Sequence, residues 1–144
     1  MTSSPSTAAG GGPLRVQRDD RGVVTLTLDD APRFNALGHE MLAALQQALD
    51  DVARDDSVRV VVLAAAGKAF CAGHNLKDMA ANSDLAWYQR LFAQCSRMML
   101  SIHKLPVPVI ARVHGMATAA GCQLVAQCDL AVAADVAKFA VSGI

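Results

Sequence analysis

The sequence lacks the charge excess and the long apolar segments that would direct it to nucleic acid or to a membrane. Only 18% of its 144 residues are charged, and 13 Lys and Arg balance 13 Asp and Glu, so the formal net charge is zero. Without a basic stripe, we expect no nucleic-acid partner. The longest uninterrupted apolar run covers residues 60–66. It is far shorter than the roughly 20 residues that a membrane-spanning helix needs, so we expect no membrane partner.

Cysteine is scarce and lacks the spacing of a disulfide framework or a metal site. The four cysteines are Cys71, Cys95, Cys122 and Cys128, and none forms a C-x-x-C pair. This pattern favours neither a zinc site nor paired disulfides, so no metal is expected. Reduced thiols are typical of a cytoplasmic protein, with the mitochondrial matrix as the alternative for a eukaryotic source.

The first thirteen residues have neither the apolar core of a secretory signal nor any arginine. They are rich in Ser, Thr, Ala and Gly. We interpret residues 1–13 as a flexible tail, and residues 14–144 as one domain.

What the sequence does have is apolar residues, 53% of the total, placed with clear periodicity. Two short runs flank a turn at Asp20-Arg21-Gly22, which predicts a hairpin. Further strands are predicted at residues 58–64, 107–113, 130–134 and 138–141, the first of them buried on both faces. Helices are predicted at residues 38–54, 84–103 (capped by Ser83) and 118–127. Strands that alternate with helices indicate an α/β fold.

Two segments combine a buried strand with a loop of small residues that leads into a helix. They are residues 67–77 and residues 114–123. Small residues let a ligand approach the main chain closely, and the first N–H groups of a helix are free donors. Two such loops that faced each other would hold a carbonyl oxygen as it becomes an oxyanion. Each loop alone is weak evidence, because ordinary strand-to-helix turns are also rich in Ala and Gly.

Nucleotide-binding motifs are absent. Gly67-Lys68 follows a strand, but a P-loop would need Gly in place of Val62 and Ser or Thr in place of Ala69. No G-x-G-x-x-G occurs. The sequence therefore supports neither ATP nor dinucleotide binding, and no cofactor is expected.

Four motifs in one order carry a family resemblance. They are Phe34-Asn35-Ala36-Leu37, the loop from Lys68 to Lys77, the Pro-Val-Pro-Val-Ile-Ala strand at 106–111, and Gly121-Cys122-Gln123-Leu124. Together they resemble the crotonase (enoyl-CoA hydratase/isomerase) family over about residues 14–144. The resemblance implies an α/β fold built as a spiral of ββα units, and an acyl-CoA thioester as ligand, with coenzyme A entering only as part of the substrate.

The resemblance also implies where the site lies. In the family, two main-chain N–H groups form an oxyanion hole, and by position these belong to His74 and Ala120. The loop from Ala72 to Lys77 corresponds to the family's loop that lines the path of coenzyme A. The substrate-binding residues implied in this way are Ala72, Gly73, Asn75, Leu76, Lys77 and Gly121.

Two glutamates that hold and activate water in the hydratases of this family have no counterpart here. Their positions are occupied by Gln123 and Gly143. An amide has no proton to exchange near neutral pH, and a positioned acid or base is worth about 10²–10⁴-fold in rate. The ring of His74 is the best spare base, although a packed or solvent-exposed histidine is the simpler interpretation. Little hydration is therefore expected.

Length is the second departure. Family members are about twice as long, and their C-terminal helices complete the acyl pocket and build homotrimers or hexamers. We therefore expect an apparently truncated first half, with apolar surface uncovered on the helix at 84–103 and the strands at 58–64 and 107–113. Three functions remain open: an enzyme that stabilises a thioester enolate in fatty acid or acyl-CoA metabolism, a non-catalytic acyl-CoA-binding or regulatory subunit, and an inactive fragment.

Overall fold

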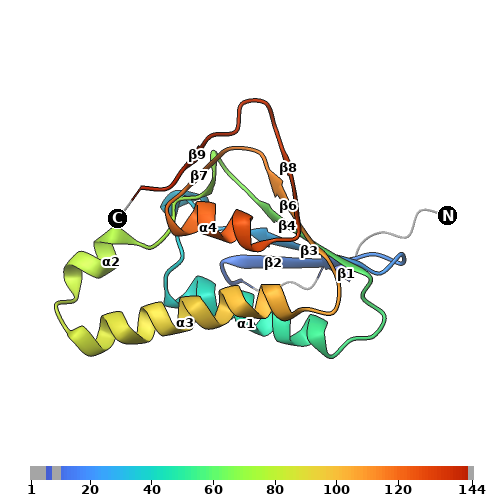
Figure 1. Cartoon of the computed structure of the whole chain (residues 1–144), viewed down its shortest axis with the longest axis horizontal. Coiled ribbons are helices and arrows are strands. Elements are labelled where there is room, and N and C mark those ends of the chain that lie inside the picture. The colour runs from blue at the N-terminus through green and yellow to red at the C-terminus, as the bar shows by residue number, and fades with distance from the viewer. Residues whose placement is uncertain (1–5, 8–10, 143–144) are drawn as a thin grey trace.

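The computed structural model describes residues 6–7 and 11–142, and Figure 1 shows how the chain is arranged. Of the predicted tail at 1–13, only Ser6–Thr7 and residues 11–13 fall within this part. The described strands are β1 Ser6–Thr7, β2 Leu14–Arg18, β3 Val23–Leu28, β4 Val60–Ala65, β5 Ala69–Cys71, β6 Val109–Val113, β7 Met116–Thr118, β8 Leu130–Ala133 and β9 Phe139–Ala140. The helices are α1 His39–Ala53, α2 Leu76–Ala81, α3 Leu85–Lys104 and α4 Ala120–Gln127, with a 3₁₀ turn at Ala31–Arg33.

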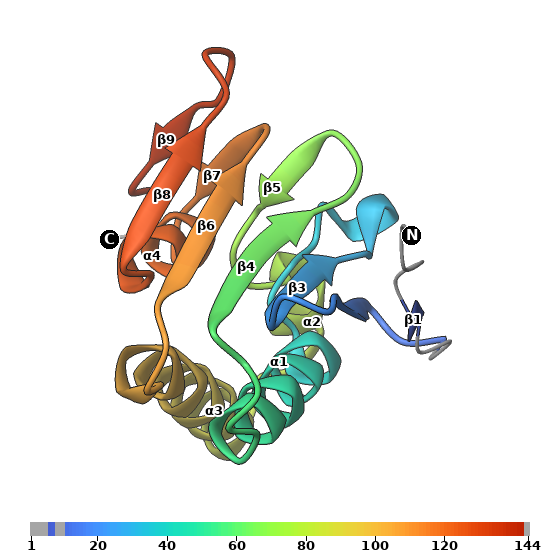
Figure 2. The same cartoon turned by 90° about the vertical axis from the view of Figure 1, so that its right-hand side faces the viewer.

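The strands form two sheets, and from β4 onward each strand of the larger sheet is followed by one of the smaller sheet. The larger sheet has the order β1-β2-β3-β4-β6-β8, and the smaller has the order β5-β7-β9. From β3 to β8 all neighbours in the larger sheet are parallel, as are all neighbours in the smaller one. In Figure 2, β4 continues into β5, β6 into β7 and β8 into β9. Helices α2 and α3 separate the first two of these strand pairs, and α4 separates the last two. This repetition confirms the predicted α/β spiral of ββα units.

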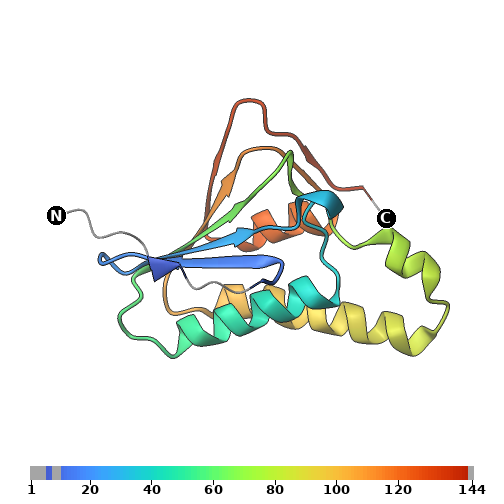
Figure 3. The same ribbon diagram turned by 180° about the vertical axis from the view of Figure 1, so that it is seen from behind.

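The core lies between the large sheet and the two long helices. Figures 1 and 3 show α1 and α3 side by side below the sheets, with α4 between the sheets. The apolar positions of both long helices recur every three or four residues, so each helix has one apolar face to bury. The buried residues of these faces are Met41, Leu42, Leu45, Ala48, Leu49 and Val52 on α1, and Leu91, Cys95, Met98, Met99 and Ile102 on α3.

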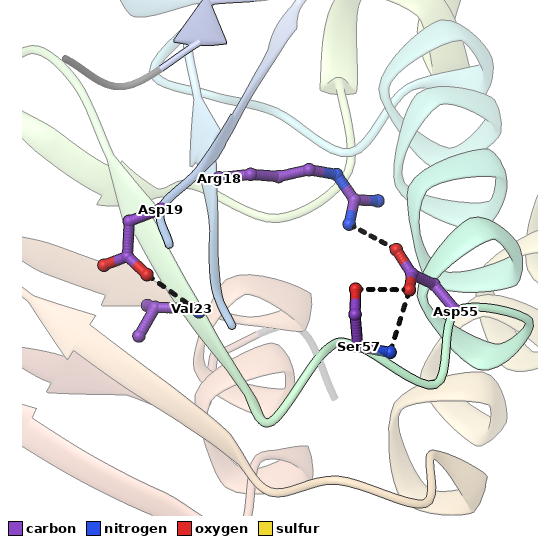
Figure 4. A network of polar contacts seen from close by, with 5 residues as sticks. All are labelled: Arg18, Asp19, Val23, Asp55 and Ser57. Atoms are coloured by element: carbon purple, nitrogen blue, oxygen red, sulfur yellow. Dashed lines mark hydrogen bonds and ion pairs between the residues drawn. The ribbon is translucent and has the colours of Figure 1, made fainter. Parts of the chain in front are cut away.

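Two carboxylates fasten the loops at one end of the large sheet (Figure 4). In the predicted hairpin turn, Asp19 accepts hydrogen bonds from the main-chain N–H groups of Arg21 and Val23, at 2.8 and 3.1 Å. Asp55 accepts from the Ser57 hydroxyl at 2.6 Å and from Arg18 Nη1 at 2.8 Å. The Ser57 hydroxyl bond is the main cause that holds the pKa of Asp55 below its usual value. These bonds join the end of β2 to the loop between α1 and β4.

Several predicted boundaries were wrong. Strands β5 and β7 lie within segments predicted as loop or helix, so α4 begins at Ala120 and not at residue 118. Both strands have only three residues, too short for a periodic signal. The cap of α3 is Asp84, whose carboxylate accepts from the Ala86 N–H at 3.1 Å, and not Ser83. Strand β4 was predicted to be buried on both faces, but Val60 and Val62 are only half-buried.

The uncovered apolar surface also differs from the prediction. It is present on α3, where Leu85, Phe92 and Leu100 are exposed, but the apolar residues of β4 and β6 are all buried or half-buried. Much of the remaining exposed apolar surface lies on β8, on β9 and on the residues next to them, at Leu130, Val132, Val136, Phe139 and Val141. All four residues of β8, which is one of the two outer strands of the large sheet in the described part of the chain, are exposed. No helix in the described ranges is both long and apolar enough to cross a membrane.

Candidate functional site

The first predicted loop leaves β5 at Cys71 and turns sharply at Gly73. The φ of Gly73 is +85°, a conformation that costs residues with a Cβ roughly 1–2 kcal/mol. A Cβ built on Gly73 would lie 3.1 Å from the main-chain nitrogen of Ala120. A glycine is thus needed here for conformation and for space, and it brings the Gly73–His74 peptide against the start of α4.

The second loop connects β7 to α4 through a strained alanine. Ala119 has φ +51° and ψ −124°, which an alanine rarely adopts. Its N–H donates to the Ala140 carbonyl at 2.9 Å, and its carbonyl accepts from the Gln123 N–H at 3.1 Å. These two bonds fix both sides of the strained residue. Ala120 is then the first residue of α4, where an N–H has no acceptor within its own helix.

Gly121 allows the two loops to lie close together. A Cβ on this residue would overlap the carbonyl oxygen of Cys71 at the end of β5. Only glycine lets α4 approach β5 so closely. Gly73 and Gly121 therefore contribute through the closeness of their main chains, and neither lines a cavity described below.

His74 offers a free main-chain donor and a ring that is already engaged. Among the described residues, its N–H has no hydrogen-bond acceptor. Its ring Nδ1 lies 3.2 Å from the carbonyl oxygen of Leu37, and the ring meets Phe92 edge-on at 5.3 Å between centroids. Because a carbonyl can only accept, Nδ1 carries the proton in this contact. In a neutral ring, Nε2 is left as the acceptor.

A cavity of about 630 Å³ brings together three of the predicted catalytic positions. His74, Ala120 and Gln123 all line it, with Gln123 contributing an exposed side chain. The complete lining is His74, Phe92, Ala119, Ala120, Cys122, Gln123, Ala126, Val141 and Ser142. The fourth predicted position, Gly143, lies outside the described residues. No Asp or Glu is among the described residues that line this cavity.

A second cavity of about 360 Å³ shares His74 with the first and continues along the predicted coenzyme A loop. Its lining includes four of the predicted substrate-binding residues, Ala72, Asn75, Leu76 and Lys77. The Asn75 side chain is engaged as the cap of α2, because its carbonyl oxygen accepts from the N–H groups of Lys77 and Asp78 at 3.1 and 3.3 Å. Lys77 is exposed and supplies a positive charge.

Residues 34–37 support this site in a way that the sequence did not reveal. Asn35 is fully buried, and its side-chain Nδ2 donates to the carbonyls of Ala66, Ala69 and Phe70 at 2.8, 3.0 and 3.2 Å. Its side-chain oxygen accepts from the Asp30 N–H at 2.8 Å. The motif itself was visible, and the positive φ of Asn35, +54°, is one that Asn tolerates.

Cysteine chemistry at the site is limited by burial. Burial raises the pKa of the Cys71 thiol to about 12, and the Gly73 main chain only partly opposes the shift. Cys71 therefore stays protonated near neutral pH, and its Sγ donates to the Asn35 carbonyl at 3.2 Å. In the described part of the chain, no group of three or more His, Cys, Asp or Glu side chains is arranged to hold a metal ion.

These features agree with the comparisons to known families. Residues 18–144 match the family described as enoyl-CoA hydratase/isomerase. The chain belongs to this family, which is the crotonase family that the motifs indicated. It is 42% identical over 132 residues to enoyl-CoA hydratase domain-containing protein 3, mitochondrial, of Xenopus laevis, covering 92% of this chain and 45% of the relative. It is 38% identical over 128 residues to 1,2-epoxyphenylacetyl-CoA isomerase of Escherichia coli, covering 85% of this chain and 48% of that protein.

Solved structures give the same result. An enoyl-CoA hydratase from Mycobacterium smegmatis superimposes with a TM-score of 0.89 at 63% identity, over 90% of this chain and 51% of that chain. Human enoyl-CoA hydratase domain-containing protein 3 gives 0.84 at 38% identity, over 88% and 50%. The chain spans about half the length of the curated relatives it matches. Several relatives are named mitochondrial, so the predicted cytoplasmic location gains no support from them.

Proposed function

We propose that this protein binds an acyl-CoA thioester and polarises its carbonyl between the main-chain N–H groups of His74 and Ala120. The observation that carries the proposal is that these residues, from loops 46 positions apart in the sequence, line one cavity and are held together by close packing at Gly73. A carbonyl oxygen that gains negative charge is stabilised by donors fixed in advance. The acyl group would occupy the larger cavity, and coenzyme A would follow the smaller one past Lys77.

The chemistry favoured at this site is enolate stabilisation and not hydration. Hydration needs a general base for water, and the described lining of the larger cavity holds the Gln123 amide but no carboxylate. His74 Nε2 is the one basic ring atom that this lining offers, because Nδ1 is bound to Leu37. A relative named as an isomerase indicates that the family's chemistry extends beyond water addition.

A second candidate is acyl-CoA binding without turnover. The same observation favours it: His74 and Ala120 line one cavity, while Gln123 stands where the resemblance places the glutamate of the family's hydratases. Binding and turnover therefore need separate measurements. We expect saturable binding of butyryl-CoA and negligible hydration of crotonyl-CoA by the same preparation.

The variant Ala120→Pro tests the clamp directly. Proline is well tolerated at the first position of a helix, removes the N–H that lies there and places its ring carbon Cδ where that hydrogen was. One lost hydrogen bond should weaken butyryl-CoA binding about tenfold relative to free coenzyme A. The matched control is Leu85→Pro, at the first position of α3, where the side chain is exposed. Equal preference for the thioester in Ala120→Pro and in the wild type would refute the proposed carbonyl clamp, and rapid hydration of crotonyl-CoA would refute the loss of acid–base chemistry.

A further inference from the structure

We propose that Leu37 is a positioning residue for the His74 amide, and that its main-chain hydrogen bond to Gly73 aims the His74 N–H into the larger cavity. This inference rests on the proposed function, since it names what orients one of the two donors. Leu37 does not line either cavity that His74 lines. Its side chain is fully buried, so it acts only through its main chain.

The geometry of one peptide unit carries the first step. The Leu37 N–H donates to the Gly73 carbonyl at 2.7 Å. The described peptide bonds include no cis bond, and in a trans peptide the C=O and the following N–H point in opposite directions. The carbonyl of Gly73 and the N–H of His74 belong to the same unit. Holding that carbonyl toward Leu37 therefore turns the His74 N–H away from residues 34–37.

The same residue also holds the His74 side chain. The Leu37 carbonyl accepts from ring Nδ1 of His74 at 3.2 Å. Leu37 thus contacts His74 on both sides of its N–H, through the preceding carbonyl and through the ring. The peptide cannot rotate about its flanking bonds without breaking one of these contacts. The N–H is left without an acceptor among the described residues, which is the condition for a donor reserved for a ligand.

Residues 34–37 are themselves fixed along the strand that leads to His74. The Phe34 carbonyl accepts from the Ala72 N–H at 3.0 Å, and the Asn35 carbonyl accepts from Cys71 Sγ at 3.2 Å. Phe34 and Asn35 both have positive φ, at +53° and +54°. Such consecutive left-handed residues persist only when their surroundings hold them.

The buried side chain of Asn35 supplies that hold. Its Nδ2 donates to carbonyls on both sides of the turn between β4 and β5, and its oxygen accepts from the Asp30 N–H. One side chain therefore fixes residues 34–37 to β5, the strand that leads to His74. The arrangement separates two roles: Asn35 locks the segment, and Leu37 orients the donor.

The sharpest test removes one main-chain N–H and keeps the side chain. Leu37 is replaced, in the full chain, by its α-hydroxy analogue leucic acid, which keeps the side chain and exchanges the main-chain N–H for an ester oxygen. The matched control is the same exchange at Leu42, another fully buried leucine whose N–H donates to the Gly38 carbonyl at 3.0 Å in α1. Both proteins lose one buried main-chain hydrogen bond, but only the first loses a contact to the Gly73–His74 peptide.

The readout is the ¹³C resonance of butyryl-CoA labelled at the thioester carbonyl, which moves downfield when the carbonyl is polarised. The wild type should show the shift on saturation. The Leu37 ester should lose about half of it or more, with butyryl-CoA bound roughly 3–10-fold more weakly, since one of two donors is misaligned. The Leu42 ester should keep the full shift.

The outcomes separate the two proposals. A wild-type protein that binds butyryl-CoA with no carbonyl shift would refute the proposed clamp. A wild-type shift that the Leu37 ester retains in full would leave the clamp intact and overturn the positioning role. If the Leu37 ester does not fold, Asn35→Gly carries the test, because glycine keeps the positive φ and removes only the side-chain bonds. A reduced shift in that variant supports the proposal, and an unchanged shift overturns it.

Discussion

Gly73 lies against Ala120 so closely that a Cβ on the glycine would be 3.1 Å from the alanine nitrogen. Two loops that are far apart in the sequence thus meet through main-chain atoms. The distance between the proposed donors depends on this packing and on the fit of Gly121 against Cys71. Any added side-chain volume at either glycine must separate the loops.

We predict that Gly73→Ala lowers both stability and thioester binding. The left-handed φ of +85° disfavours alanine by about 1–2 kcal/mol, and the new methyl group presses on Ala120. The free energy of unfolding from denaturant melts should fall by at least about 1 kcal/mol, and butyryl-CoA affinity should fall with it. Gly12→Ala is the control, because a Cβ there meets nothing within 4 Å. Melts and affinities that do not differ between the two variants would contradict the packing argument.

A second prediction concerns alkaline pH and the buried Cys71 thiol. Its pKa is raised from 9.0 to about 12 in the folded protein, so the unfolded chain loses this proton first. Stability should therefore be fully present below pH 9 and should fall as pH rises toward 12, by up to about 1.4 kcal/mol per pH unit for this thiol. Cys128, whose pKa is likewise raised to about 12 by burial, adds a similar slope.

Urea unfolding of the wild type and of Cys71→Ala, under reducing conditions from pH 6 to 10.5, measures this slope. Below pH 8 the two curves of stability against pH should run parallel, offset by the cavity that the substitution leaves. Above pH 9 the wild type should lose stability faster. Parallel curves over the whole range would mean that the Cys71 thiol ionises as easily in the folded protein as in the unfolded chain.

The elements that the sequence predicts well are those with long apolar periodicity. Helices α1 and α3 repeat their apolar residues over four or more turns, so their existence follows from pattern alone. Strands β5 and β7 carry three residues each and owe their structure to pairing with each other and with β9, which leaves no local signal. The start of α4 was misplaced for the same reason, since β7 occupies the residues just before it.

Only part of the candidate site can be proposed from the sequence, and the limit has a physical cause. Position in the family motif indicates His74 and Ala120, and the small residues around them indicate close main-chain approach. The supporting role of Asn35 depends on carbonyls 31 to 35 residues away, which no local pattern can reveal. The engagement of the His74 ring by Leu37 is likewise a contact across 37 residues.

A third prediction concerns the exposed outer strand β8. Leu130 and Val132 are 62% and 65% exposed, and apolar side chains on an outer strand favour pairing with other chains. The 144-residue polypeptide should bind an apolar dye and show a mass that rises with concentration in sedimentation. Leu130→Thr with Val132→Thr should reduce both effects, because threonine keeps the strand and lowers its hydrophobicity.

The control for this variant is Val136→Thr, a substitution of an apolar residue that is 70% exposed outside the strands. It removes exposed apolar area at one position without touching β8. A wild-type polypeptide that sediments as a monomer and binds no dye would show that this surface is inert. Equal effects of the two substitutions would assign the association to apolar area in general and not to β8.

Consecutive strands from β4 to β9 alternate between the two sheets, and this topology affects how the protein folds. Since β4, β6 and β8 continue directly into β5, β7 and β9, neither sheet can assemble completely before the other begins. The parallel pairings also join distant residues, such as Val23 with Val60 and Val61 with Val109. Long loops must close before these contacts form, so folding should be slow. Unfolding should then be all-or-none, with amide protons of both sheets exchanging through one common opening.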